Sequence, residues 1–233
     1  MIDHRPFASL GHADHGWLKA AHHFSFAAYH DPARIHWGAL RVWNDDSIAA
    51  HSGFAPHPHA DMEIITFVHA GAISHRDSLG NDGRIGAGEV QVMHAGTGIT
   101  HSEMNREGTE TRLFQIWILP DAKGGPAGWE QRQFANLAAG GGFVTLASGM
   151  AGDSADALSL RADARVMGAR VAAGDIIEHR LGAGRHAYLV AIDGRIRIDG
   201  VEAAPRDGIA IKDHPTIRIE ALEDTQIILV ETR

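Results

Sequence analysis

The sequence predicts an all-β protein made of two antiparallel β-barrels. From about residue 36 onward, short runs of alternating or β-branched residues are separated by Gly, Asn and Asp, which is typical of consecutive strands and hairpins. A segment with two prolines and three glycines interrupts this pattern at residues 120–128. The order strand, Gly, strand at residues 65–73 recurs at residues 188–196, which indicates two halves of one architecture. A single sandwich of nine to twelve strands is the alternative, and the Gly/Pro segment argues against it.

Each expected strand is bounded by turn residues. In the first half we expect strands at residues 35–43, 62–68, 71–77, 90–93 and 113–119. In the second half we expect them at residues 142–148, 165–171, 176–181, 188–192, 195–198, 208–211, 216–221 and 226–232. Asp193-Gly194 and Asp199-Gly200 are hairpin turns, because Asp and Gly both tolerate a positive φ. We place the domain boundary in the Gly/Pro segment, giving domains 1–125 and 126–233.

Composition excludes several classes of function. The chain of 233 residues has 21 Lys+Arg against 29 Asp+Glu, for a net charge of −8, and no block of basic residues, so we expect no direct nucleic-acid binding. It has no cysteine, which excludes disulfides, thiolate metal ligands and cysteine nucleophiles. The start of the chain is polar and every apolar run is short, so we expect a cytoplasmic protein without a membrane segment.

Histidines are concentrated in the first half, where 14 of the 17 lie at or before His101. His57 and His59 are two residues apart, and so are His101 and Glu103. Side chains two apart on a strand project from the same face, roughly 6.6 Å from each other along it. Two such pairs on neighbouring strands would direct four ligands into one barrel. The sequence therefore predicts a metal site there.

Three imidazoles and one carboxylate suit Fe(II), Mn, Ni, Cu or Zn rather than Ca or Mg. Open positions on such an ion would make the site reactive rather than purely structural. By spacing alone Glu63 could replace Glu103 as the carboxylate ligand, because it lies four residues after His59. Asp61 is interpreted as a supporting or structural residue. The other histidines are interpreted as ordinary side chains: His75 and His94 have no partner at ligand spacing, and the adjacent His22 and His23 cannot both face a common site.

Several motifs resemble the pirin family of the cupin superfamily. They are Pro56-His57-Pro58-His59-Ala60-Asp61-Met62-Glu63-Ile64, Asp77-Ser78-Leu79-Gly80-Asn81 and Ala95 through His101-Ser102-Glu103-Met104-Asn105. Upstream, His22-His23-Phe24-Ser25-Phe26 and Leu40-Arg41-Val42-Trp43-Asn44-Asp45-Asp46 fit the same family. The similarity is almost continuous from His22 to Asn105 and weaker beyond.

The resemblance implies a bicupin, with two cupin-type antiparallel β-barrels and one mononuclear metal in the N-terminal barrel only. It assigns His57, His59, His101 and Glu103 as the ligands, and so selects Glu103 over Glu63. In the C-terminal barrel Arg180 and Gly182 stand where the first histidine pair would be, so that barrel is expected to bind no metal. The expected ion is divalent, with Fe(II) the first choice and Mn, Ni, Co, Cu or Zn as alternatives.

The function implied by the resemblance is that of a quercetinase-type dioxygenase, which opens the ring of a flavonol with O2. Glu103 would act as the catalytic residue by accepting the proton of the flavonol hydroxyl. The alternative is a non-enzymatic, iron-dependent redox-sensing partner of a transcription regulator or other protein. A sugar isomerase or other zinc cupin is a third hypothesis, and it would need Lys and Arg side chains facing the metal.

Overall fold

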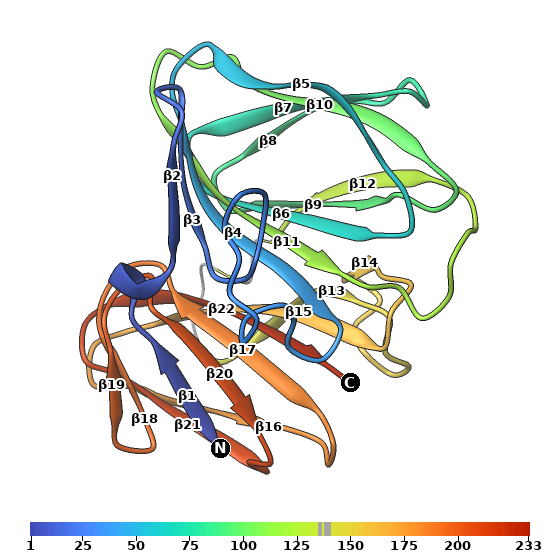
Figure 1. Cartoon of the computed structure of the whole chain (residues 1–233). Coiled ribbons are helices and arrows are strands. Elements are labelled where there is room, and N and C mark those ends of the chain that lie inside the picture. Colours follow the sequence, from blue (N-terminus) through green and yellow to red (C-terminus); the bar gives the residue numbers. More distant parts are fainter. Residues whose placement is uncertain (135–136, 138–140) are drawn as a thin grey trace.

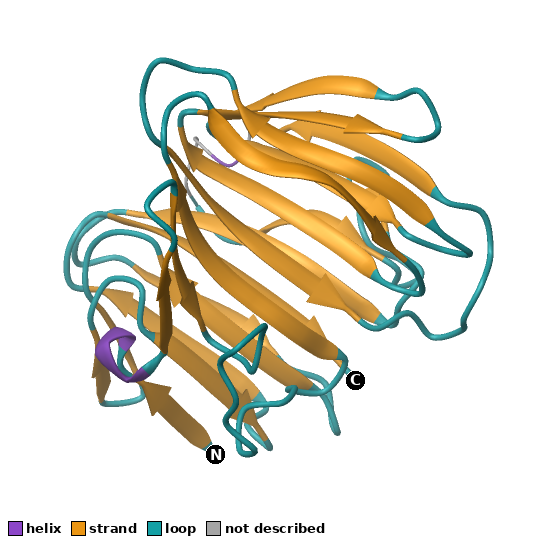
Figure 2. Cartoon of the chain, turned by 45° about the horizontal axis from the view of Figure 1, so that its top comes forward, coloured by secondary structure: helices purple, strands orange, loops and turns teal. Residues whose placement is uncertain are grey.

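Nearly all secondary structure in the computed structural model, which describes residues 1–134, 137 and 141–233, is β-strand (Figure 2). A short 3-10 helix, η1 (Phe7–Ser9), follows the first strand. The strands are β1 (Ile2–Arg5), β2 (Gly11–Asp14), β3 (Leu18–His22), β4 (Leu40–Ile48), β5 (Ser52–His59), β6 (Glu63–Ala70), β7 (Ala72–Asp77), β8 (Asp82–Gly86), β9 (Glu89–His94), β10 (Ile99–Asn105), β11 (Thr111–Ile118), β12 (Gly128–Gln133), β13 (Val144–Ser148), β14 (Leu158–Ser159), β15 (Ala164–Val171), β16 (Ile176–Arg180), β17 (His186–Ala191), β18 (Ile196–Ile198), β19 (Val201–Ala203), β20 (Gly208–Lys212), β21 (Thr216–Ala221) and β22 (Thr225–Thr232). In the described part of the chain, no helix has the length and apolarity needed to cross a bilayer.

The strands form four sheets, two in each half of the molecule (Figure 1). The N-terminal half pairs a seven-stranded sheet of order β12-β9-β6-β11-β4-β3-β2 with a four-stranded sheet of order β5-β10-β7-β8. The C-terminal half repeats this plan with β1-β20-β17-β22-β15-β13-β14 and β16-β21-β18-β19. The predicted all-β protein with two halves of one architecture is confirmed. Among the described residues, no strand pairing closes the two sheets of a half into a continuous barrel, so each half is a sandwich.

The two halves exchange their edge strands. β1, at the start of the chain, pairs with β20 of the C-terminal half, in the register Ile2↔Ile211. β12, which follows the Gly/Pro segment, pairs with β9 of the N-terminal half. Each half therefore depends on a strand from the other side of the predicted boundary. The division into residues 1–125 and 126–233 stays a prediction.

The two seven-stranded sheets pack against each other back to back. One apolar cluster joins Trp43, Phe67 and Phe114 of the N-terminal half to Tyr188 and Val230 of the C-terminal half. The central strands are therefore buried on both faces, which explains unbroken apolar runs such as that of β6.

The interiors of the two sandwiches differ. The interior of the C-terminal half is filled by one cluster of 17 buried apolar side chains. The interior of the N-terminal half holds two smaller clusters, one around Ile73 and Leu113 and one around Ile64 and Met93. The N-terminal sandwich thus leaves room for polar side chains between its sheets.

Candidate metal centre

Three histidines converge at the open edge of the N-terminal four-stranded sheet. His57 and His59 lie on the edge strand β5, and His101 lies opposite His57 on β10. Strands β5 and β10 lie side by side in Figure 1. One side-chain nitrogen from each of the three lies within 4.8 Å of the other two. Pro56 and Pro58 flank these histidines, and an edge strand tolerates proline because it need not donate every backbone hydrogen bond.

The geometry of these rings fits a shared metal ion. Nε2 of His57 and Nε2 of His101 face each other at 3.1 Å. Two nitrogen ligands on an ion with bonds of about 2.0–2.1 Å are separated by about 3 Å. Nδ1–H of His57 donates a hydrogen bond to the carbonyl of Ala55 at 2.8 Å, which leaves the lone pair of Nε2 free to bind an ion.

The local environment keeps two of the three rings neutral. Burial, and then the neighbouring His57, lower the pKa of His59 to about 4. Burial, followed by His57, His59 and His75, lowers the pKa of His101 to about 3. Near neutral pH both rings therefore carry a free lone pair, which is the form that binds a metal.

Glu103 lies two residues beyond His101 on β10, on the same inward face. One ligand atom each of His75, His101 and Glu103 lies within 4.8 Å of the others. The carboxylate accepts hydrogen bonds from Gln91 at 2.5 Å and from Gln115. Burial raises the pKa of Glu103 to about 7, although these hydrogen bonds act in the opposite direction. Glu103 is thus a buried carboxyl group that can exchange a proton near neutral pH.

The side chains that hold Glu103 form a chain across the interior. The indole N–H of Trp129 donates to the side-chain oxygen of Gln91 at 2.7 Å, and the amide of Gln91 donates in turn to Glu103. This fixes the amide orientation of Gln91, and so the position of the carboxylate oxygen that it holds. His101 and Glu103 both point inward because residues two apart on a strand share a face, and β10 pairs regularly with β7 at these positions. The pairing of β10 with β5 shifts between the same two residues, and the extra residue of this bulge lies in β5.

A cavity of about 200 Å³ lies beside these residues, between the two sheets of the N-terminal half. Its polar lining comes from both sheets and comprises His22, Asn44, Asp46, His57, His59, His101, Glu103 and Gln115. Its apolar lining comprises Leu18, Ala20, Phe26, Phe54, Ile64 and Trp117. A pocket with aromatic walls and a few convergent polar groups is typical of a site for a small ligand.

Glu63 lies away from the three histidines. Its carboxylate holds Nδ1 of His94 at 2.6 Å and the backbone N–H of Arg161 at 2.9 Å, and it does not line the cavity. The spacing argument assumed that one strand runs from His57 to Glu63, whereas β5 ends at His59 and the chain turns at Asp61, which has a φ of 49°. Asp61 itself accepts the backbone N–H of Gly124 at 2.7 Å, which is a structural role.

Sequence reasoning missed several residues of the site because their partners are distant in the chain. His22 was interpreted as ordinary, yet it lines the cavity, where its Nδ1 contacts Oδ1 of Asn44 at 2.8 Å. His75 lies opposite Glu103 on β7, and its Nε2 contacts Asp77 at 3.1 Å. Only the pairing of β10 with β7 brings His75 to the cluster, and no motif could have revealed this.

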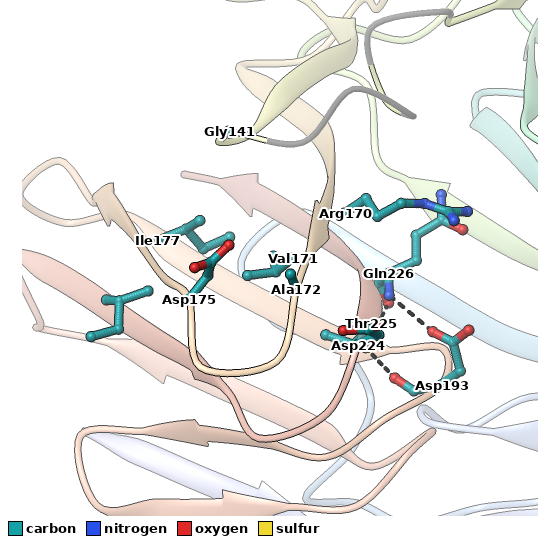
Figure 3. A pocket seen from close by; sticks show the side chains of 11 residues that line it. Gly141, Arg170, Val171, Ala172, Asp175, Ile177, Asp193, Asp224, Thr225 and Gln226 are labelled. Atoms are coloured by element: carbon teal, nitrogen blue, oxygen red, sulfur yellow. Dashed lines mark hydrogen bonds between the residues drawn. The ribbon is translucent and has the colours of Figure 1, made fainter.

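A hollow of about 530 Å³ lies in the C-terminal half, near Arg170, Asp175, Asp193 and Asp224 (Figure 3). Its acids hold the local backbone. Asp193 accepts the N–H of Gln226 at 2.9 Å, and Asp224 accepts the N–H of Ala173 at 2.8 Å. These contacts stabilise the turns, and among the described residues this hollow has no group of three acids or histidines close enough to share an ion.

The C-terminal sandwich carries an ion-pair cluster instead of a histidine cluster. The strand that takes the place of β5 there is β16, whose inward residue His179 contacts Oε2 of Glu231 at 2.8 Å. Arg165 binds the same oxygen at 2.8 Å. In the part of the chain that the structure describes, every group of three acids or histidines close enough to share an ion lies in the N-terminal half.

Two sandwiches of equal strand order, one with a histidine-lined cavity, define a bicupin, and the fold predicted from the sequence is confirmed in this respect. Residues 3–118 match the family described as Pirin, and residues 145–232 match the family described as Quercetinase C-terminal cupin domain. The chain belongs to the pirin family.

Similar proteins share this organisation over their whole length. The chain is 56% identical to a pirin-like protein of Caulobacter vibrioides, with 99% of both chains covered. It is 41% identical to a quercetin 2,3-dioxygenase of Escherichia coli strain K12, covering 99% of this chain and 98% of that protein. The crystal structure of the bacterial pirin YhhW from Escherichia coli in complex with nickel(II) superposes with a TM-score of 0.93 at 41% identity, covering 100% of this chain and 99% of the other.

Proposed function

We propose that the protein is a metal-dependent dioxygenase of the quercetinase type, which opens the ring of a flavonol with O2. The observation that carries this proposal is the convergence of three imidazoles and one buried carboxyl group on an aromatic-walled cavity. The relative named quercetin 2,3-dioxygenase and the nickel-bound pirin support the choice of reaction and the presence of an ion.

In this proposal His57, His59, His101 and Glu103 hold one divalent transition metal. Fe(II) remains the first expectation, and the nickel of the related pirin adds weight to the alternative Ni. A bound ion would supply Lewis acidity, which lowers the pKa of a hydroxyl group that binds it. The residues of the chain supply the proton acceptor, the amides that position it and the aromatic walls of the cavity.

Glu103 is the proposed proton acceptor. It is a buried carboxylate on the wall of the cavity, so it is placed to take a proton from a phenolic hydroxyl that enters there. Gln91 and Gln115 keep its carboxylate in place before and after this transfer. Phe26, Phe54 and Trp117 would contact the flat faces of the substrate and exclude water.

Elemental analysis tests the site before any substrate is sought. Protein purified without added metal should contain about one ion per chain, and H57A should contain almost none. The matched control is H30A, which removes an exposed histidine outside the cavity and should keep its metal. Equal metal content in H57A and the wild type would refute the ligand assignment.

Aerobic incubation with quercetin tests the reaction. Protein loaded with Fe, Mn, Ni, Co or Cu should cause loss of the flavonol absorbance, and H57A should not. If none of these five ions supports turnover, the proposed activity is wrong even where the metal site is intact.

A further inference from the structure

Asp46 is a buried carboxyl group that faces the cavity, and one of its oxygens has no hydrogen-bond partner among the described residues. It lies on β4, in the sheet opposite the one that carries the three histidines, and lines the same cavity. Only 2% of it is exposed, and its Oδ1 has no hydrogen-bond partner among the described residues. A buried polar atom without a partner destabilises the folded chain, so such a group needs an explanation outside the stability of the fold.

The neighbours of Asp46 on β4 each have at least one side-chain partner among the described residues. Asn44 faces the same cavity, and its side-chain oxygen is held by His22 at 2.8 Å. Asp45 points to the other face of the sheet, where Arg206 binds its Oδ2 at 2.6 Å, although its Oδ1 has no hydrogen-bond partner among the described residues. Within the part of the chain that the structure describes, Asp46 has no comparable side-chain contact, although it lies in the same strand.

The sequence of β4 adds an independent observation. Asn and Asp are depleted in strands, and three in succession are unfavourable in the middle of a buried sheet. Asn44, Asp45 and Asp46 are nevertheless all strand residues with less than one tenth of their surface exposed. Natural proteins place residues against their strand propensity mostly at functional sites, where a particular side chain is needed.

We infer that Asp46 recognises a hydroxyl group of the aromatic ligand, on the wall of the cavity that faces the metal ligands. The inference rests on the proposed flavonol function, because it assumes an aromatic substrate with hydroxyl groups beyond the one that binds the ion. Burial, followed by the charges of Asp45 and Glu103, raises the pKa of Asp46 well above its ordinary value. In its protonated form the carboxyl both donates and accepts a hydrogen bond, and in its ionised form it accepts one, so either form pairs with a phenolic hydroxyl.

The volume of the cavity limits the size of the ligand group that can contact Asp46. A cavity of 150 Å³ is known to hold one benzene ring, so about 200 Å³ accommodates one substituted outer ring of a flavonol, beside the ring whose hydroxyl binds the ion. The substrate class is therefore a polyhydroxylated aromatic compound that presents one hydroxyl to the histidines and another to Asp46. Unsubstituted rings would leave the carboxyl unpaired and bind less tightly.

Two flavonols separate the role of Asp46 from metal binding. Quercetin has hydroxyl groups on its outer rings, whereas 3-hydroxyflavone keeps only the hydroxyl next to the carbonyl. Affinities are measured on nickel-loaded protein without oxygen, through quenching of tryptophan fluorescence. D46L should reduce the preference for quercetin over 3-hydroxyflavone about tenfold or more, because the buried hydroxyl loses its partner. D46N should keep most of the preference, because an amide also donates and accepts.

Thermal unfolding separates this role from a structural one. D46L should raise the melting temperature by several degrees, because it removes an unpaired buried carboxyl. N44L is the matched control on the same face, and it should lower the melting temperature by leaving His22 without its partner. A D46L protein that melts below the wild type, or that keeps the wild-type preference between the flavonols, overturns the inference. Wild-type protein that binds neither flavonol instead refutes the proposed function, and the inference fails with it.

Discussion

Glu231 is expected to be a main electrostatic support of the C-terminal half. It is completely buried on β22, and its Oε2 receives hydrogen bonds from Arg165 at 2.8 and 3.0 Å and contacts Nε2 of His179 at 2.8 Å. Arg185 also contacts its carboxylate. Burial alone would raise the pKa of Glu231, but the bonds from His179 and Arg165 outweigh burial and lower the pKa to about 2.

The magnitude follows from this pKa. An ordinary glutamate has a pKa of 4.5, and the decrease to about 2 corresponds to about 3 kcal/mol of stability near neutral pH. Because the folded-state pKa is the lower one, this contribution is complete above about pH 4.5. It is lost as the pH falls toward 2, when the folded protein also takes up the proton.

The substitution E231Q removes the charge while keeping the size of the side chain. We expect the free energy of unfolding at pH 7 to fall by about 3 kcal/mol, and by up to 5 kcal/mol if Arg165 and Arg185 are left without a counter-charge. Urea unfolding monitored by fluorescence and circular dichroism measures this loss. In the wild type the stability should decrease more steeply between pH 4.5 and 2 than in E231Q.

A matched control is E223Q. Glu223 pairs with Arg195 at 3.0 Å on the surface, and its removal should leave the unfolding curve unchanged. Two results would refute the electrostatic account of this cluster. One is an E231Q protein that is as stable as the wild type, and the other is the same dependence of stability on pH in E231Q and the wild type.

Two further substitutions concern the N-terminal half. E63Q should weaken the contacts to His94 and Arg161 and cost about 1–3 kcal/mol in urea unfolding, while elemental analysis still finds about one metal per chain; metal loss would reinstate Glu63 as a ligand. Q115L removes one of the amide donors that hold Glu103, and we expect the metal affinity to fall about 10–100-fold in a chelator competition, with little change in overall secondary structure; unchanged affinity would show that the amide does not position the carboxylate.

Strand prediction failed where polar residues are buried. A strand was predicted at residues 35–43, ending before Asn44, because Asn and Asp usually mark turns. The observed strand β4 covers Leu40–Ile48 and runs through Asn44, Asp45 and Asp46. His22 and Arg206, which contact two of these residues, come from distant parts of the chain. Local propensity carries no information about such partners.

The sequence by itself determined the all-β fold, the two similar halves and the two histidine-containing pairs near residues 57 and 101. These features depend on alternation, turn residues and spacing, and all three are local properties of the chain. The motifs also identified the family, because they span most of the N-terminal half.

The tertiary structure alone decided which polar residues share the cavity. By spacing alone, either Glu63 or Glu103 could be the carboxylate ligand of the metal. Only the turn at Asp61 directs Glu63 toward His94 and away from the three histidines. The sequence also did not predict that β1 and β12 pair with the opposite halves. The backbone hydrogen bonds of an edge strand are the same in either sheet, so its sequence does not specify which sheet it joins. Contacts between residues far apart in the chain are set by strand register and sheet packing, and a linear pattern does not record them.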